Sequence, residues 1–271
     1  MKIFDFNIHL PDTSDIGGVN EKVHTEIVAS GSDLVERVSK LDFLEDIAGA
    51  NFMVFNSSLV LKEENFVTEV RKHVPLSAFT LLIDFRSPDG FKQIEAAHAQ
   101  GFSCIKFHSY HQNIRKEDYP AILALCKHAE ARGLSICLDG SYGTSFMIEN
   151  DIIEFICCVS RNISKVPVIV LHSGGLKCME IFLLAMERKN IYLEMSATQS
   201  IYEGSRIHED LAFIYNKIGD RRILFASDSP YFEFGDSVRC AKKILDQSGF
   251  DDGAQKNIFY ANATRILGLK A

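Results

Sequence analysis

The stretch that decides the fold runs from residue 101 to residue 140 and reads GFSCIKFHSYHQNIRKEDYPAILALCKHAEARGLSICLDG. It holds two short β-rich runs, SCIKFHS (103–109) and LSICLDG (134–140). Between them lies YPAILALCKHAEARG (119–133), whose apolar residues recur at helical spacing and which ends on Gly133, a usual helix stop. A strand, a helix and a second strand in this order predict a right-handed βαβ unit with parallel strands.

The same alternation extends along the whole chain. The other β-rich runs are KIFDFNI (2–8), NFMVFNS (51–57), AFTLLIDF (78–85), VPVIVLHS (166–173), IYLEMSA (191–197) and RRILFASD (221–228), and amphipathic segments lie between them at 32–49, 90–101, 147–162 and 176–190. Eight strands at a spacing of roughly 25 to 35 residues predict a closed (β/α)8 TIM barrel as a single domain over residues 1–271. An open doubly wound sheet is the rival, but no strand is followed by a G-x-G-x-x-G turn.

Two further segments complete the predicted barrel. Residues 11–32 are polar and weakly periodic and include Gly17-Gly18, which predicts a long loop over the mouth of the barrel. A C-terminal helix is expected from about Ala254 to Leu267, packed on the outside of the barrel.

Composition narrows the classes of function. The chain has 271 residues, 46% of them hydrophobic and 24% charged, and a net charge of -7 without any Lys/Arg-rich block, which argues against a nucleic-acid surface. No apolar run approaches the roughly 20 residues that cross a bilayer, and no signal-peptide pattern precedes the first strand, so a cytoplasmic protein is expected. The seven cysteines show no C-x-x-C spacing and are expected to be reduced. The expected partner is a small-molecule substrate, and a homo-oligomer stays open.

Polar side chains gather at the predicted strand ends, where a barrel of this type carries its active site. In the first run, Asp5, Asn7 and His9 are spaced two apart, so simple alternation places them on one face. The other polar residues at strand ends are Lys106, His108, Asp139, His172, Glu194 or Ser196, and Asp228. Imidazoles and carboxylates that converge in this way can bind a divalent cation. The alternative is that each of them only completes ordinary hydrogen bonds at the end of its strand.

Four of these segments together resemble the amidohydrolase superfamily, in particular its amidohydrolase-related branch, which includes decarboxylases similar to aminocarboxymuconate-semialdehyde decarboxylase. The resembling stretches are GFSCIKFHS (101–109), VIVLHSGG (168–175), RILFASDSPY (222–231) and NATRILGL (262–269). The resemblance implies a metal site on the first, fifth and eighth strands, with a histidine of the sixth strand near the metal or the substrate. His9, His172 and Asp228 match the family's positions. Asn7 and Asp139 stand where the family has histidines.

The resemblance therefore implies a metal-dependent hydrolase of an amide, ester or lactone, in which His9, Asp139, His172 and Asp228 hold a divalent ion, expected to be zinc. Asp228 would transfer the proton, with His172 as the second catalytic residue. Asn7, Lys106 and His108 would bind the substrate, and the cationic Lys106 favours one that carries a carboxylate. Three alternatives stay open: a non-oxidative decarboxylase, a metal-independent lactonase that uses Asp228 as base, and a barrel that binds a ligand without catalysis.

Overall fold

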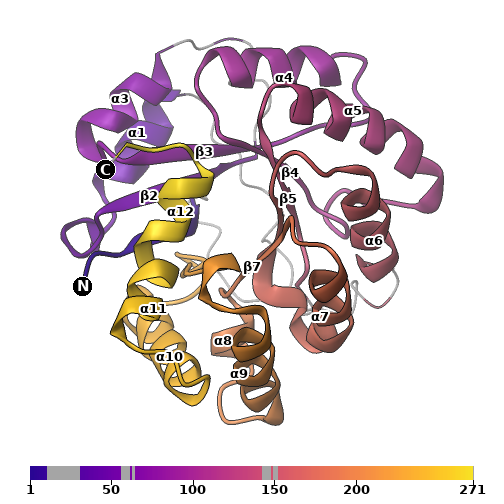
Figure 1. Cartoon of the computed structure of the whole chain (residues 1–271). Coiled ribbons are helices and arrows are strands. Elements are labelled where there is room, and N and C mark those ends of the chain that lie inside the picture. Colours follow the sequence, from indigo (N-terminus) through magenta and orange to yellow (C-terminus); the bar gives the residue numbers. More distant parts are fainter. Residues whose placement is uncertain (11–30, 56–61, 63–64, 142–147, 149–151, 271) are drawn as a thin grey trace.

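Eight parallel strands form a barrel in the computed structural model, which describes residues 1–10, 31–55, 62, 65–141, 148 and 152–270 (Figure 1). Each strand pairs with the next along the chain, and their bounds are β1 Phe4–His9, β2 Gly49–Val54, β3 Ser77–Leu82, β4 Cys104–Phe107, β5 Ser135–Leu138, β6 Val168–Val170, β7 Ile191–Glu194 and β8 Ile223–Leu224. The segment after β8 closes the barrel onto β1, because Phe6 N–H donates to the Phe225 carbonyl (3.1 Å) and His9 N–H to the Ser229 carbonyl (2.8 Å). The predicted (β/α)8 barrel is confirmed.

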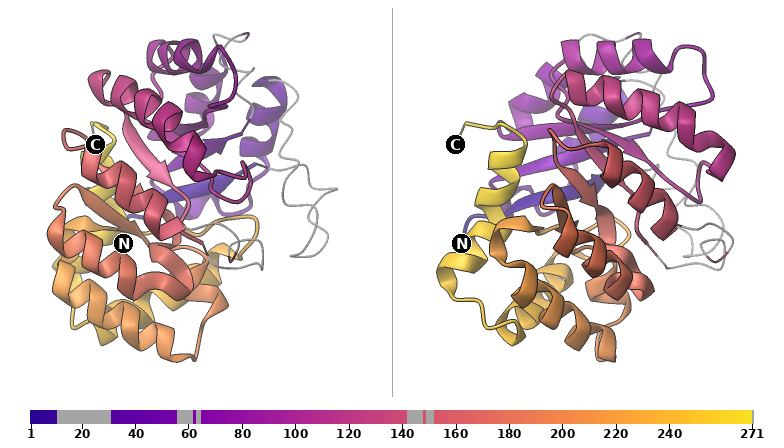
Figure 2. Two further views of the ribbon diagram at one scale, coloured as in Figure 1. Left: turned by 90° about the vertical axis from the view of Figure 1, so that its right-hand side faces the viewer. Right: turned by 45° about the vertical axis from the view of Figure 1, so that its right-hand side comes forward.

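Helices surround the strands on the outside (Figures 1 and 2). Their bounds are α1 Gly31–Ser39, α3 Phe66–His73, α4 Gly90–Ala99, α5 Tyr119–Ala131, α6 Ile152–Asn162, α7 Cys178–Glu187, α8 Thr198–Ile201, α9 Arg206–Ile218, α10 Phe234–Gln247, α11 Asp252–Lys256 and α12 Asn262–Ile266. Glycines with positive φ follow α4 and α5, at Gly101 (81°) and Gly133 (74°), as expected for helix stops.

The structure changes the prediction for the segment after β1. Residues 11–30 of the predicted loop lie outside the described residues, and the loop cannot extend to residue 32 because α1 already begins at Gly31. The helix expected over 32–49 also ends early, at Ser39, and only a short 3-10 turn at Leu44–Asp46 follows. The helix ends in a tighter turn, because Lys40 N–H and Leu41 N–H donate to carbonyls three residues back, those of Arg37 (3.1 Å) and Val38 (3.2 Å).

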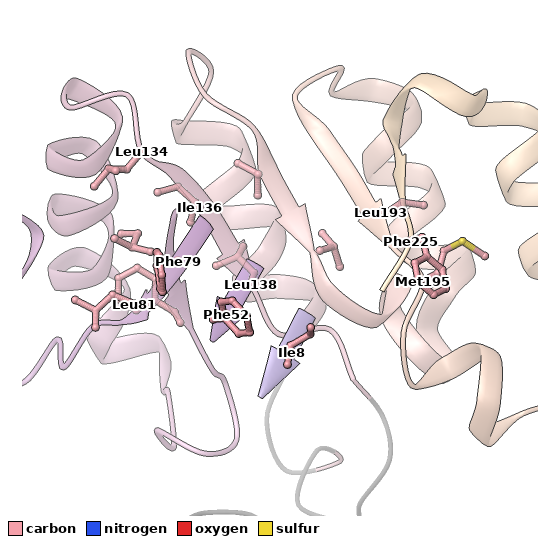
Figure 3. Packing of buried hydrophobic residues seen from close by; sticks show 14 of the residues in the cluster. Ile8, Phe52, Phe79, Leu81, Leu134, Ile136, Leu138, Leu193, Met195 and Phe225 are labelled. Atoms are coloured by element: carbon pink, nitrogen blue, oxygen red, sulfur yellow. The ribbon is translucent and has the colours of Figure 1, made fainter. Parts of the chain in front are cut away.

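The strands divide their apolar side chains between two hydrophobic clusters. The outer cluster packs between strands and helices and includes Phe52, Phe79, Ile136, Leu138 and Phe225 (Figure 3). The inner cluster takes alternate strand residues, among them Phe4, Phe6, Met53, Ala78, Cys104, Cys137 and Ile169. This division follows from the two-residue period of a strand, and it leaves the C-terminal ends of the strands to polar side chains.

Strand β1 does not alternate simply. Phe6 packs in the inner cluster and Ile8, two residues later, in the outer one, and the pairing with β2 shifts register between Asp5 and Ile8. Asp5 accepts hydrogen bonds from Asn7 N–H (3.2 Å) and from Ser227 N–H (2.9 Å). The expectation of one shared face for Asp5, Asn7 and His9 is therefore wrong, because a bulge separates Asp5 from the other two.

The C-terminal helix predicted from Ala254 to Leu267 is present, as a continuous helical segment from Asp252 to Ile266 with a π-helical turn at Asn257–Ala261, but its predicted place on the outside of the barrel is wrong. Its Ala263 and the following Leu267 join the inner cluster, and the Ser103 hydroxyl at the start of β4 contacts the Leu267 carbonyl (3.5 Å). This segment therefore covers the N-terminal end of the barrel, opposite the candidate site. Within the described ranges, every helix is too short or too polar to span a membrane.

Candidate active site

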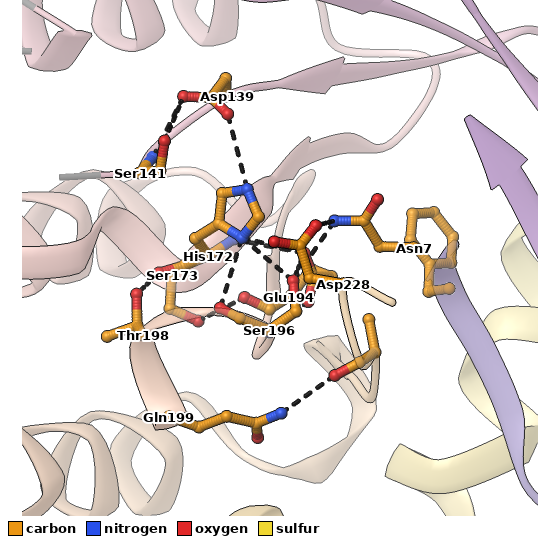
Figure 4. Close-up of polar contacts among 12 residues, drawn as sticks. Asn7, Asp139, Ser141, His172, Ser173, Glu194, Ser196, Thr198, Gln199 and Asp228 are labelled. Carbon is orange, nitrogen blue, oxygen red and sulfur yellow. Dashed lines mark hydrogen bonds and ion pairs between the residues drawn. The ribbon is translucent and has the colours of Figure 1, made fainter. Parts of the chain in front are cut away.

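Polar side chains that follow β1, β5, β6, β7 and β8 meet on one side of the barrel (Figure 4), and His108, after β4, joins them through Asp139. The backbone there is unusual, since His172 (60°), Ser173 (51°), Ala197 (55°) and Asp228 (63°) have positive φ although none is glycine. Such conformations cost free energy and persist only where the surroundings hold them. Their position directly after β6, β7 and β8 points to a functional site.

Asp228 lies at the centre of this site. One carboxylate oxygen, Oδ1, accepts a hydrogen bond from Asn7 Nδ2 (2.9 Å) and lies 3.4 Å from His9 Nε2. The His9 ring in turn packs edge-on against Phe55 and Tyr231, with ring centroids 5.2 Å and 5.3 Å away. Burial would raise the pKa of Asp228, but the neighbouring His172, His9 and Lys106 outweigh it and lower that pKa. Asp228 is thus held as a carboxylate.

Lys106 is a buried cation, with 1% of the residue exposed. Its Nζ lies 4.8 Å from the centroid of the Phe55 ring, a cation–π contact. Across the described residues, no carboxylate lies within ion-pair distance of Nζ, and no hydrogen bond satisfies it. A buried ammonium that lacks an anionic partner is costly, so it marks a place where an anion binds.

The Asp139 carboxylate contacts the rings of two histidines, His108 and His172. Its Oδ2 lies 3.4 Å from His108 Nε2 and 3.5 Å from His172 Nε2, while Oδ1 accepts a hydrogen bond from the Ser141 hydroxyl (2.7 Å). Burial lowers the pKa of His108 well below its usual range, so this ring is neutral.

Burial also acts to lower the pKa of His172, but the nearby carboxylates of Asp228, Asp139 and Glu194 outweigh burial and raise this pKa to about 9. Burial likewise opposes ionisation of Asp139, yet the surrounding imidazoles and Lys106 hold its pKa far below the usual range. The site therefore contains an imidazolium at His172 between ionised carboxylates.

Strand β7 contributes two residues that the sequence indicated only as strand-end candidates. Glu194, fully buried, accepts hydrogen bonds from His172 N–H (3.3 Å), from the Ser196 hydroxyl (2.9 Å) and from Ser196 N–H. The Ser196 oxygen lies 3.0 Å from His172 Nδ1 and 3.3 Å from Asn7 Nδ2. Phe55 was not anticipated at all, because a single aromatic residue after a strand carries no sequence signal of function.

The residues predicted to bind metal lie in one region but do not form one ligand set. His9 Nε2 lies nearest Asp228 and His172 Nε2 nearest Asp139, and His172 also interacts electrostatically with Asp228, so these ring nitrogens face carboxylates and not a shared centre. Over the part of the chain that the structure describes, no three His, Cys, Asp or Glu side chains are grouped so as to hold a metal ion. Asn7, which the resemblance placed at a histidine position, has an amide oxygen that is a weak metal ligand, and its amide nitrogen donates to Asp228. The predicted set does not fit a metal in this arrangement.

Comparison with known proteins gives a family match and several similar structures. The family model for amidohydrolases matches residues 63–269. No curated protein matches the chain by sequence.

Three similar structures cover nearly the whole chain. A protein assigned as a 2-pyrone-4,6-dicarboxylic acid hydrolase from Acinetobacter baumannii, with citric acid bound, is 14% identical over 99% of this chain and 100% of its own, with a TM-score of 0.67. A 2,6-dihydroxybenzoate decarboxylase in complex with 2,6-dihydroxybenzoate is 12% identical over 99% of both chains, with a TM-score of 0.68. A dihydroxybenzoic acid decarboxylase from a Polaromonas species, with bound manganese and an inhibitor, is 12% identical over 100% of this chain and 98% of its own, with a TM-score of 0.66. At these identities the likeness shows the barrel fold.

Proposed function

Because this chain belongs to the amidohydrolase family, we propose that it hydrolyses an amide, ester or lactone bond in a small substrate that carries a carboxylate. Family membership confirms the superfamily and the enzyme class that the sequence predicted. The substrate, the bond that is cleaved and the roles of individual residues are the proposal.

The observation that carries the proposal is the buried ammonium of Lys106. It faces Phe55 and has no carboxylate within ion-pair distance in the described part of the chain. A substrate carboxylate would supply the missing charge through a charge-assisted hydrogen bond. The neutral ring of His108 can donate or accept a further hydrogen bond beside it, because its Nδ1 has no partner among the described residues. The citric acid bound to the similar Acinetobacter protein is consistent with an anion site in this fold.

Asp228 is the residue best placed to act as a general base. Its Oδ1 is already engaged by Asn7 and His9, while the structure gives Oδ2 no hydrogen bond to any described residue. Oδ2 would take one proton from a water molecule as the water oxygen bonds to the substrate carbonyl carbon. Asp228 would then give that proton to the leaving oxygen or nitrogen as its bond to carbon breaks. His172, as an imidazolium, keeps Asp228 ionised before the reaction.

Non-oxidative decarboxylation is the second candidate. It is favoured by the likeness to two dihydroxybenzoate decarboxylases along the full length of the chain. In that reaction Lys106 would hold a carboxylate or phenolate oxygen of the substrate, and a protonated side chain would deliver a proton to the carbon that loses CO2.

In the described part of the chain, no three His, Cys, Asp or Glu side chains are grouped so as to hold a metal ion, and the hydrolysis described above uses Lys106, Asp228 and water alone. The manganese of the Polaromonas decarboxylase shows that a divalent ion occurs in proteins of this fold. Zinc in this chain stays a prediction, as do the cytoplasmic location and a homo-oligomer.

A substrate screen followed by one substitution tests the proposal. The screen pairs lactones, esters and N-acyl compounds with and without a carboxylate, and it includes aryl carboxylates assayed for CO2 release. Asp228→Asn keeps the side-chain shape and should lower kcat on any substrate found by about a hundredfold or more, with the thermal unfolding temperature little changed. Asp89→Asn, on the surface, is the matched control.

Unchanged turnover in Asp228→Asn would overturn the role of Asp228. Preference for the uncharged member of each pair would overturn the substrate class, and CO2 release would establish decarboxylation instead of hydrolysis. A screen without any turnover, combined with tight binding of carboxylates, would favour a barrel that binds a ligand without catalysis.

A further inference from the structure

We propose that Glu194 and Ser196 are positioning residues, which form a one-directional hydrogen-bond chain that keeps a proton on Nδ1 of His172 and holds the amide nitrogen of Asn7. The part of this inference that concerns catalysis rests on the proposed function. The hydrogen-bond chain itself is a property of the resting protein.

The chain begins at Glu194, which is fully buried and surrounded by donors. Its Oε1 accepts Ser196 N–H, and its Oε2 accepts both His172 N–H (3.3 Å) and the Ser196 hydroxyl (2.9 Å). The two backbone N–H groups can only donate, so the carboxylate must accept from them. An ionised Glu194 can only accept, so with Glu194 as a carboxylate the Ser196 hydroxyl donates its proton to Oε2.

With its proton committed, the Ser196 oxygen can only accept from its other neighbours. These are His172 Nδ1 at 3.0 Å and Asn7 Nδ2 at 3.3 Å (Figure 4). Nδ1 of His172 must therefore carry a proton, and the Ser196 carbonyl, 3.3 Å from the same nitrogen, requires a donor there as well. The opposite ring nitrogen, Nε2, is left to face Asp139 and the site.

The same chain determines how Asn7 presents its amide. Its nitrogen is shared between Ser196 and Asp228 Oδ1, which leaves the amide oxygen on the other side. That oxygen, Oδ1, is buried and has no hydrogen-bond partner among the described residues. An unsatisfied buried acceptor beside a general base is suited to accept a hydrogen bond from the attacking water or from a substrate hydroxyl.

In the rival arrangement the same hydrogen bonds run in the opposite direction, from Glu194 to His172. Burial raises the pKa of Glu194, and a protonated Glu194 would donate to Ser196, whose hydroxyl would then donate to an unprotonated Nδ1. In this rival His172 is neutral, with its proton on Nε2, and is not the imidazolium described above. The two arrangements share all heavy-atom positions, so they differ only in where the protons lie.

Nuclear magnetic resonance of protein labelled with 15N-histidine separates the two directions without a substrate. We expect Nδ1 of His172, assigned with the variant His172→Gln, to show a directly bonded proton in slow exchange with water. Ser196→Ala and Glu194→Gln should each lose this signal or speed its exchange about tenfold, because the acceptor is removed or the chain is broken. Ser173→Ala is the matched control. That serine is equally buried, and its hydroxyl bonds the Glu194 carbonyl and Tyr215 without contacting the His172 ring.

Kinetics adds the functional half of the test. On a substrate found by the screen, Ser196→Ala should lower kcat about tenfold with KM changed less than about threefold, and Ser196→Thr, which keeps the hydroxyl, should recover most of the loss.

An Nδ1 without a proton in the native protein, or an equal response to Ser173→Ala, overturns the proposed chain even if the protein is a hydrolase. A protonated Nδ1 combined with a screen that finds no turnover overturns the proposed hydrolase function and leaves the chain intact. Normal kcat in Ser196→Ala overturns the positioning role.

Discussion

The substitution Lys106→Met tests whether the buried cation contributes to substrate binding or to the stability of the fold. Methionine has a similar length and fills the same space beside Phe55, but it has no charge. Lys106 as a residue is 1% exposed; its Nζ lies 4.8 Å from the Phe55 ring centroid and has no hydrogen bond or ion pair to another described residue. If this cation serves an anionic substrate, its removal should weaken substrate binding without loss of stability.

The size of both effects follows from the surroundings of Lys106. A hydrogen bond between a charged pair contributes about 1.5–3 kcal/mol, which corresponds to a loss of roughly 10- to 150-fold in affinity for a carboxylate substrate. In the folded protein, burial of an ammonium costs several kcal/mol, and the cation–π contact and the more distant Asp139 and Asp228 offset only part of this. The free energy of unfolding of Lys106→Met should therefore be unchanged or higher by up to about 2 kcal/mol.

Two measurements check these expectations together. Urea unfolding gives the stability of Lys106→Met, and the KM for matched substrates with and without a carboxylate gives the change in binding. Lys92→Met, at an exposed lysine, is the control and should change neither quantity. The reasoning fails if both substrates lose affinity equally, or if the stability falls by more than about 2 kcal/mol, since Lys106 would then be a structural cation.

Three other perturbations have expected outcomes. A Cβ at Gly174 (φ 89°) would lie 2.5 Å from Ile181 Cγ1, so Gly174→Ala should lower the free energy of unfolding by about 2–4 kcal/mol in a urea titration. Gly133 also has a positive φ but has open space where a Cβ would lie, so the control Gly133→Ala should lower it by only about 1 kcal/mol. Burial raises the pKa of Asp5 from 3.8 to about 7, so the unfolding temperature should fall as the pH rises from about 4 to 7. Asp5→Asn should make the unfolding temperature less dependent on pH in this range, and an unchanged dependence would contradict the role of Asp5. The predicted metal is checked by elemental analysis of protein purified without a chelator and by turnover before and after dialysis against one. About one divalent ion per chain and activity that zinc restores would bear the prediction out, whereas no bound ion and unchanged turnover would refute it.

Stability falls with rising pH because the folded protein holds the Asp5 proton to a higher pH than the unfolded chain does. The folded protein holds that proton up to about pH 7, whereas the unfolded chain releases it near the ordinary value of 3.8. The stabilisation is therefore complete below about pH 4 and is lost as the pH rises through 7.

The barrel and the region of the site were predictable from local patterns. Strand and helix periods are properties of neighbouring residues, and parallel strands in a barrel place their C-terminal ends together, so Asn7, His9, Lys106, His172 and Asp228 were expected in one region. The structure places them there. Their catalytic and binding roles stay predictions, because proximity alone does not establish chemistry.

What the sequence by itself determined is the order of eight strands and their helices, the family, and the polar character of the strand ends. Only the tertiary structure decided which of those polar groups pair with one another. A bulge in β1 separates Asp5 from Asn7 and His9, the imidazoles of His108 and His172 share Asp139, and Glu194 reaches His172 from the neighbouring strand end. These contacts join residues far apart in the chain through distances of a few ångströms. No local periodicity encodes such distances, because they depend on strand register, backbone conformation and the packing of all eight strands at once.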